Sequence, residues 1–268
     1  MEKFFNKKTV TGSFIILLLV ISITCSNSSK TFETAGNILS NKLIGWGIKR
    51  EENHNQPDVG NKNKEILEKN NGICLGNKEK AYIYLTFDEG YEAGYTAQIL
   101  DILKKNNVTA TFFITSHYLN TEPELVKRML DEGHIVGNHT VNHKSLPTLS
   151  DEKVKSEIMN LHKEIYEKFD YEMKYIRPPK GEFSERTLYI SNSLGYKTVM
   201  WSFAYCDWDE NNQLNEEKAK EMIINNLHNG EIILLHGNSK TNTNILDSTI
   251  KYIKNQNYEF KSLEQFEK

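Results

Sequence analysis

Residues 82–90 read YIYLTFDEG, an apolar run that ends in two adjacent carboxylates, Asp88 and Glu89, followed by a glycine. A run this short, and this rich in aromatic and β-branched residues, predicts a buried β-strand. Neighbouring side chains on a strand diverge, so one acid can bind a metal while the other stays free as a base. The plainer interpretation is a polar turn at the end of a strand, and this stretch alone does not decide between the two.

Apolar runs of the same kind recur along the chain and alternate with amphipathic stretches. Further strands are predicted at residues 109–114, 134–138, 174–177, 198–201, 231–235 and 258–261. Helices are predicted between them, at residues 97–106, 122–132, 150–170, 184–194, 216–227 and 243–255. This alternation predicts an α/β fold with a parallel sheet, either open or closed. We favour a distorted (β/α) barrel of about seven parallel strands, because a barrel gathers all its strand ends on one face, whereas an open sheet gathers them at a switch point.

The first 28 residues have the pattern of an export signal peptide or an N-terminal anchor. Lys3, Lys7 and Lys8 precede an apolar run at residues 10–23, and small polar residues follow it. The run is shorter than the roughly 20 residues that a membrane span needs, although an uncleaved anchor stays open. A buried helix and a lipid attached to Cys25 are the alternatives. We expect an N-terminal extension at residues 29–79 and the catalytic domain at residues 80–268.

The bulk composition excludes some classes of partner. Lysine plus arginine number 33 and aspartate plus glutamate 36, which gives a formal net charge of −3 over 268 residues. A nucleic-acid-binding protein normally needs a basic patch, so we expect no nucleic-acid partner. The three cysteines, Cys25, Cys74 and Cys206, do not make a disulfide framework or a zinc motif. We interpret Cys74 and Cys206 as buried small residues.

Two histidines follow the predicted strand at residues 134–138. The stretch GNHTVNH, residues 137–143, places His139 and His143 four residues apart. On a helical turn this spacing puts both imidazoles on one side, where they can hold a divalent cation. A pair of surface histidines is the alternative interpretation.

Three further clusters follow other predicted strands. In YIRPPKG, residues 175–181, two prolines and a glycine fix a rigid turn and aim Arg177, which can steady a carboxylate. Asp207 and Trp208 place an acid beside an aromatic ring, and His236 lies just beyond a buried strand. Each cluster alone can be a stiff loop, a packing feature or a structural histidine. Their order and placement along the chain indicate a functional site.

Taken together, the five clusters resemble the five motifs of the polysaccharide deacetylase family, the NodB-like domain of carbohydrate esterase family four. The resemblance covers about residues 80–268 and includes FKSL, residues 260–263, which is similar to the family's closing strand. A narrower similarity, carried by TFDEGYE at 86–92, GYT at 94–96 and RPP at 177–179, is to the muramic-acid deacetylases of spore-forming bacteria. Residues 45–58 look like the N-terminal extension of that subgroup, which implies that they pack on the barrel.

The resemblance implies catalytic roles for four residues. Asp88 would be the general base that deprotonates the attacking water, and Arg177 would orient and tune it. His236 would be the general acid that protonates the departing amine, and Asp207 would tune it. The substrate pocket would include Tyr91, Pro178, Trp208 and Leu234.

The resemblance also implies a divalent metal ion, zinc first, with manganese or cobalt as alternatives. His139 and His143 would be ligands, normally completed by the second acid of the first motif. The typical family member has aspartate where this chain has Glu89, and the spore subgroup departs from aspartate here too. Glutamate is one methylene longer, so Glu89 can ligate the ion only with a shifted geometry, or the two imidazoles hold the ion without it.

The function implied is that of a hydrolase of carbon–nitrogen bonds other than peptide bonds. Its reaction would remove the N-acetyl group of N-acetylmuramic acid in peptidoglycan, releasing acetate and supporting muramic δ-lactam formation in spore cortex. Deacetylation of N-acetylglucosamine in peptidoglycan or chitin-like polymers, O-deacetylation of xylan, and a catalytically inactive wall-glycan-binding protein are the alternatives. We expect an exported monomer in the cell envelope or spore cortex space, tethered to the membrane, if at all, only by its N-terminal segment.

Overall fold

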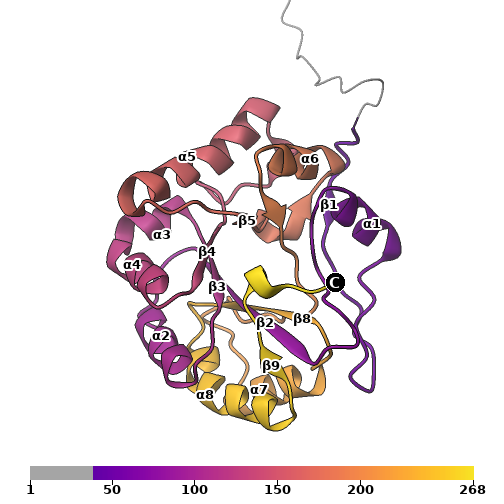
Figure 1. Cartoon of the computed structure of the whole chain (residues 1–268), viewed down its shortest axis with the longest axis vertical. Helices are drawn as coiled ribbons and strands as arrows, with labels where there is room; N and C mark the ends of the chain where they lie inside the picture. Colours follow the sequence, from indigo (N-terminus) through magenta and orange to yellow (C-terminus); the bar gives the residue numbers. More distant parts are fainter. Residues whose placement is uncertain (1–38) are drawn as a thin grey trace, which may run out of the picture. The chain divides into compact units, whose positions relative to one another are not determined.

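The computed structural model describes residues 39–268, and the segment expected to be an export signal or anchor lies outside this range. Within it, helices lie around the outside of a curled sheet (Figure 1). None of the helices in this range is long and apolar enough to cross a membrane.

Seven strands form the curled sheet, and every pairing between them is parallel. Their order is β7 (Lys197–Thr198), β5 (Tyr175–Ile176), β4 (Ile135–Asn138), β3 (Thr111–Ile114), β2 (Tyr82–Glu89) and β8 (Glu231–His236). The seventh strand, β9 (Glu259–Phe260), pairs with the first residues of β2. It lies on the same side of β2 as β3, which pairs with the last residues of β2. The predicted α/β fold with a distorted barrel of about seven parallel strands is confirmed.

The edges of the sheet, β7 and β8, are connected through single bridges rather than a full ladder. Val199 bridges Ile73, whose N–H donates to the carbonyl oxygen of Thr198 at 2.8 Å. Farther along, Phe203 bridges β8. The strand predicted at residues 198–201 is therefore shorter, because beyond Thr198 it pairs only through a single bridge to Ile73.

The helices over the sheet match the predicted ones to within a few residues at each end. They are α2 (Thr96–Lys105), α4 (Pro123–Asp131), α5 (Asp151–Phe169), α6 (Glu185–Ser193), α7 (Glu216–Asn225) and α8 (Lys240–Asn255). Two short helices were not predicted, α1 (Asn61–Lys69) and α3 (Ser116–Thr121). Helix α3 starts directly after β3, and the side chain of Thr115 caps it by accepting from the N–H of Tyr118.

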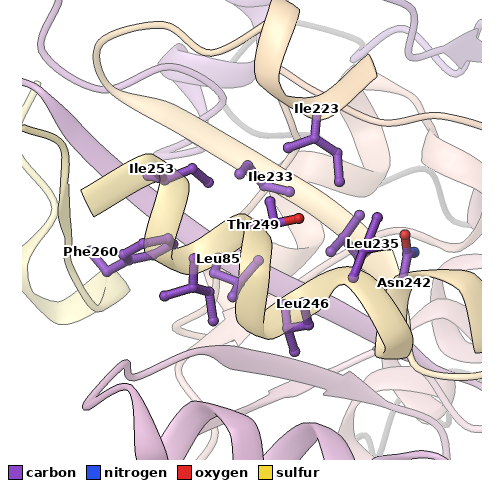
Figure 2. Close-up of a pocket in the computed structure, with 11 residues that line it drawn as sticks. Leu85, Ile223, Ile233, Leu235, Asn242, Leu246, Thr249, Ile253 and Phe260 are labelled. Carbon is purple, nitrogen blue, oxygen red and sulfur yellow. The ribbon is translucent and has the colours of Figure 1, made fainter. Parts of the chain in front are cut away.

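Apolar side chains fill the space between α8 and the central strands. Figure 2 shows Leu246 and Ile253 of α8 gathered with Leu85 of β2 and with Ile233 and Leu235 of β8. All five are at most 4% exposed. Burial of a leucine or isoleucine side chain stabilises a fold by about 1.5–3 kcal/mol. This layer therefore holds β2 and β8 firmly side by side, and both strands end in polar residues of the candidate site.

The segment before the sheet packs on it through a second group of buried residues. Strand β1 (Ile44–Gly45) pairs antiparallel with β6 (Glu182–Phe183). The backbone N–H of Trp46 donates to the carbonyl of Gly181, and its indole Nε1–H donates to the carbonyl of Trp201, both at 2.9 Å. The Trp46 ring also lies 6.2 Å from that of Phe183, between centroids. The segment thus supports the loop that follows β5 from outside.

Replacing Trp46 with alanine should lower the free energy of unfolding by about 3 kcal/mol, because a buried indole and its hydrogen bond are lost together. Trp46 is 8% exposed, whereas Tyr166 on α5 is 48% exposed and serves as the matched aromatic control. Urea unfolding followed by circular dichroism measures both variants. A Trp46→Ala protein that unfolds at the same urea concentration as Tyr166→Ala would contradict the prediction.

Candidate active site

The carboxyl ends of several strands meet at an open cavity of about 980 Å³. This volume lies at the upper end of the range found for ligand pockets. Side chains from all five sequence clusters reach it: Asp88, Tyr91, His139, His143, Lys180, Trp208, Leu234 and His236 are in its lining. The parallel sheet explains this convergence, since residues far apart in sequence follow neighbouring strands.

Asp88 is the central acid of the cavity. It is 7% exposed and accepts a hydrogen bond at 2.8 Å from Nη1 of Arg177, while its other oxygen lies 3.4 Å from Nε2 of His139. Burial alone would raise the pKa of Asp88, but the charge of Arg177, with smaller effects from His139 and His236, brings it below its usual value. Asp88 is therefore ionised at neutral pH and can accept a proton.

Arg177 is fully buried, and its charge is compensated by several contacts. Its Nε donates to the carbonyl of Val199 at 3.1 Å, and its guanidinium carbon lies 4.3 Å from the centre of the Phe113 ring. Burial lowers the pKa of Arg177, and the carboxylate of Asp88 opposes that shift. Since a buried cation is costly without its partner, the pair holds Asp88 in one orientation.

His139 and His143 come together, with ring centroids 4.8 Å apart. His139 Nδ1 lies 2.8 Å from the carbonyl oxygen of Arg177. A carbonyl only accepts, so Nδ1 carries the proton and Nε2 presents a lone pair. Burial lowers the pKa of His139 to about 4 and also lowers the pKa of His143. Two neutral imidazoles with one second-sphere carbonyl fit a divalent cation as donors.

The prediction of a helical turn between the two histidines is wrong. Residues 139–145 are irregular, and both Thr140 (φ 69°) and His143 (φ 53°) adopt left-handed backbone conformations. The carboxylate of Glu157 on α5 accepts from the backbone N–H of Asn142 at 2.8 Å and from its side-chain amide at 2.7 Å. Since side chains satisfy these backbone donors, the loop does not need helical hydrogen bonds, and its strain is held by tertiary contacts.

Glu89 is not placed with the two histidines. It follows Asp88 on the extended strand, so its side chain lies on the opposite face, where Thr96 Oγ1 donates to Oε1 at 3.3 Å. Among residues 39–268, no group of three or more histidine, cysteine or acidic side chains is arranged to hold a metal ion. The structure thus departs from the expected ligand set at Glu89, and the donors that fit are the two imidazoles.

His236 lies across from Asp88, because the two residues are partners in the β2–β8 register. Its Nδ1 is 2.7 Å from Oδ1 of Asp207, and its backbone N–H donates to Oδ2 at 2.8 Å. Asn242 Nδ2 also donates to Oδ2, at 2.5 Å. Burial lowers the pKa of His236, but the carboxylate of Asp207 more than offsets this, so the pKa is raised overall. The imidazole can therefore carry a proton near neutral pH.

Three of the four predicted pocket residues line the cavity, and Pro178 does not. Leu234 is buried in the cavity wall, while Tyr91 (46% exposed) and Trp208 (55% exposed) stand at its rim. Asn238 Nδ2 links the two aromatic residues by donating to the hydroxyl of Tyr91 (2.8 Å) and to the carbonyl of Trp208 (3.0 Å). Pro178 is buried but does not line the cavity, because the chain turns there and presents Lys180 instead.

Sequence reasoning also missed or misplaced some residues of this site. Glu157 and Asn242 lie on helices with no local motif around them, so only the folded structure reveals that they hold His143's loop and Asp207. Lys180 lies in the YIRPPKG stretch, and it is the one lysine or arginine that lines the cavity among residues 39–268. Cys74 is buried as expected, whereas Cys206 is exposed, because it lies on the irregular loop that carries Asp207.

Comparisons with known proteins agree with this geometry. A family model described as polysaccharide deacetylase matches residues 75–199. The peptidoglycan-N-acetylmuramic acid deacetylase PdaA of Bacillus subtilis is 45% identical over 231 residues, which is 85% of this chain and 88% of that protein. The solved structure of Bacillus subtilis PdaA, a family 4 carbohydrate esterase, superposes with a TM-score of 0.83 at 44% identity, over 85% of this chain and 98% of that one.

Two further relatives differ in what they do. A peptidoglycan-N-acetylglucosamine deacetylase of Bacillus cereus is 36% identical over 187 residues, 69% of this chain and 86% of that protein. A family 4 pseudoenzyme of Bacillus anthracis has a TM-score of 0.69 at 26% identity, over 73% of this chain and 68% of that one. With the five motifs assembled around one cavity and these similarities over most of its length, the chain belongs to the polysaccharide deacetylase family, carbohydrate esterase family 4.

Proposed function

We propose that this protein hydrolyses the N-acetyl group of N-acetylmuramic acid in peptidoglycan and releases acetate. The observation that carries the chemistry is the pair of proton-transfer groups, Asp88 and His236, on neighbouring strands of one cavity. One is an ionised carboxylate and the other an imidazole with a raised pKa. Amide hydrolysis needs both, a base for the water and an acid for the amine. The similarity to PdaA supports the substrate.

In the proposed reaction, Asp88 removes a proton from the attacking water as the new carbon–oxygen bond forms. Arg177 keeps Asp88 ionised and oriented through the 2.8 Å contact. His236 then gives its proton to the amide nitrogen as the carbon–nitrogen bond breaks, so acetate and a free amine leave. Asp207 keeps His236 protonated and in the correct orientation. Trp208 and Leu234 would enclose the acetyl group.

The proposed metal site consists of His139 and His143, without Glu89. A divalent cation held there, zinc before manganese or cobalt, supplies Lewis acidity toward the amide carbonyl. The chain's own contribution is to keep the imidazole of His139 neutral by burial and to orient it through the Arg177 carbonyl.

Lys180 supports muramic acid as the sugar. N-Acetylmuramic acid differs from N-acetylglucosamine by a lactyl ether that carries a carboxylate. Lys180 is exposed, lines the cavity, and has a left-handed backbone (φ 60°) that turns it away from the regular path of the loop. It lies near enough to His143 to lower the pKa of that imidazole. An ammonium group at this position can pair with the lactyl carboxylate, which no N-acetylglucosamine residue offers.

Replacing Lys180 with methionine should raise KM for glycans containing N-acetylmuramic acid by about tenfold, with little change in kcat, because a charged contact to the substrate is lost. Acetate release from N-acetylglucosamine oligomers should not change. Lys144→Met is the matched control, since Lys144 is exposed nearby but does not line the cavity. An equal loss on both kinds of glycan would contradict a role in lactyl recognition.

The reaction itself is tested by incubating residues 30–268 with peptide-free glycan strands that contain N-acetylmuramic acid and measuring free acetate. Release that depends on added metal and stops with chelator is the expected result. Release only from N-acetylglucosamine oligomers would favour the activity named for the Bacillus cereus relative. Absence of release from both glycans by a folded protein would favour a wall-binding pseudoenzyme.

The proposed setting follows from the product. Deacetylated muramic acid carries a free amine and a lactyl carboxyl on the same sugar, and these can condense to a muramic δ-lactam with loss of water. We propose that this occurs in spore cortex peptidoglycan, reached by export through the N-terminal segment at residues 1–28. The similarity to PdaA supports a cell-wall substrate.

A further inference from the structure

Glu89 packs against the backbone of Gly237, the residue after His236. A Cβ atom built at Gly237 would come closer than 3.0 Å to both carboxylate oxygens of Glu89, nearer than Cβ atoms approach other atoms. Gly237 does not have a left-handed backbone, so its φ angle would accept any residue. The missing side chain at Gly237 is therefore explained by the space that Glu89 occupies.

The side chain of Glu89 is almost fully enclosed by its neighbours. It is 1% exposed, and its Oε2 has no hydrogen-bond partner within residues 39–268. Burial, then the nearby charges of Glu92 and Asp88, raise the pKa of Glu89 well above its usual value. Glu92 is itself engaged, since its Oε1 accepts from the N–H groups of Gly94 and Tyr95 at 2.6 Å.

The contact lies where it can control the catalytic geometry. Asp88 and His236 are partners across β2 and β8, and the N–H of Gly237 donates to the carbonyl of Asp88 over a long 3.3 Å. Beyond this point the β2–β8 ladder ends. The side chain of Glu89 is therefore a packed support for the chain immediately after His236.

We propose that Glu89 is a positioning residue: its side chain supports Gly237 and thereby fixes the imidazole of His236 relative to Asp88, without ligating a metal. The proposal rests on the deacetylase function proposed above. Under this proposal the second acid of the site, Glu89, supports the general acid His236 and does not bind the metal.

Two substitutions at Glu89 distinguish a supporting side chain from a metal ligand. The two roles predict opposite results for which of the two variants is the more impaired. Glu89→Gln keeps the size and shape of the side chain against Gly237, so Zn²⁺ affinity by titration calorimetry and kcat should both stay within about twofold. Glu89→Asp keeps a carboxylate but withdraws it from Gly237, so kcat should fall about tenfold while KM and Zn²⁺ affinity hold. Loss of Zn²⁺ affinity in a folded Glu89→Gln, with Glu89→Asp unaffected, would overturn the proposal.

A substitution at Gly237 tests the contact from the other side. Gly237→Ala should lower kcat by about tenfold, because its methyl group displaces Glu89 or the chain after His236. Combining it with Glu89→Ala removes the collision, so the double variant should be more active than the product of the two single losses. Additive losses, in variants with matched thermal unfolding, would overturn the proposal.

Failure of the positioning role of Glu89 can be distinguished from failure of the proposed deacetylase function. If the unaltered protein releases no acetate from either glycan, the deacetylase function fails. The Zn²⁺ affinities of Glu89→Gln and Glu89→Asp still decide whether Glu89 is a ligand, because that measurement needs no turnover. If the unaltered protein is active, the order of the two variants in kcat decides whether Glu89 positions His236.

Discussion

Replacing Asp88 with asparagine is expected to lower kcat for acetate release by about three orders of magnitude. The amide has the size of the carboxylate and can still accept the hydrogen bond from Arg177 that is 2.8 Å long in the structure. It cannot take a proton from water, and general-base catalysis contributes about 10²–10⁴ in rate. KM should change little, because Asp88 acts on the water rather than on the sugar.

The control for Asp88→Asn is Asp131→Asn, which changes an exposed carboxylate at the end of α4 that pairs with Lys127. Acetate is measured at saturating glycan with added Zn²⁺, and circular dichroism verifies that both variants are folded. An Asp88→Asn protein that retains more than about a tenth of the original kcat would show that another group serves as the base.

Much of the fold was predictable because local and global signals agree. Short apolar runs alternate with amphipathic helices, and a parallel sheet is the arrangement that buries both. The residues at the strand ends were predictable for the same reason: Asp88, His139 and His236 follow apolar runs, and parallel strands bring such positions to one face. The seam between β7 and β8 was not predictable, because the partner of Val199 is Ile73, which precedes the sheet in the chain.

Details of the site depend on tertiary contacts that leave no local pattern. Spacing alone suggested a helical turn for His139 and His143, but Glu157, on a helix that follows in sequence, satisfies the loop's backbone instead. The motif suggested that Glu89 binds metal, yet strand geometry turns it away from Asp88. For the two histidines and for Glu89, the sequence motifs identified the residues. Where their side chains point depends on the folded backbone.

The register of β2 and β8 also links the two halves of the proposed chemistry. Asp88 and His236 lie side by side on paired parallel strands, and α8 packs against both of these strands. Each group then has its own buried partner, Arg177 for the base and Asp207 for the acid. Removing a partner should therefore alter one proton transfer while leaving the other group's surroundings intact.

Replacing Asp207 with asparagine is expected to lower kcat at pH 8 by about 10²–10³, because the general acid that it orients contributes about 10²–10⁴ in rate. Asp207 now accepts three hydrogen bonds, two from His236 and one from Asn242. An amide cannot accept at both ends, so one orientation places its NH₂ against Nδ1–H of His236 and the other places it against the remaining donors. The imidazole must then change tautomer or move.

The pH profile distinguishes this effect from simple loss of packing. Asp207 raises the pKa of His236 against the effect of burial. A general acid must be protonated, so activity falls as pH rises through that pKa. Without the carboxylate the pKa drops, and the alkaline limb of kcat should move to lower pH by about one unit or more. Asp209→Asn, on the same loop and outside the cavity lining, should leave the limb in place. An unshifted limb in Asp207→Asn would mean that His236 is not the acid, because His236 is the imidazole that contacts Asp207 among residues 39–268.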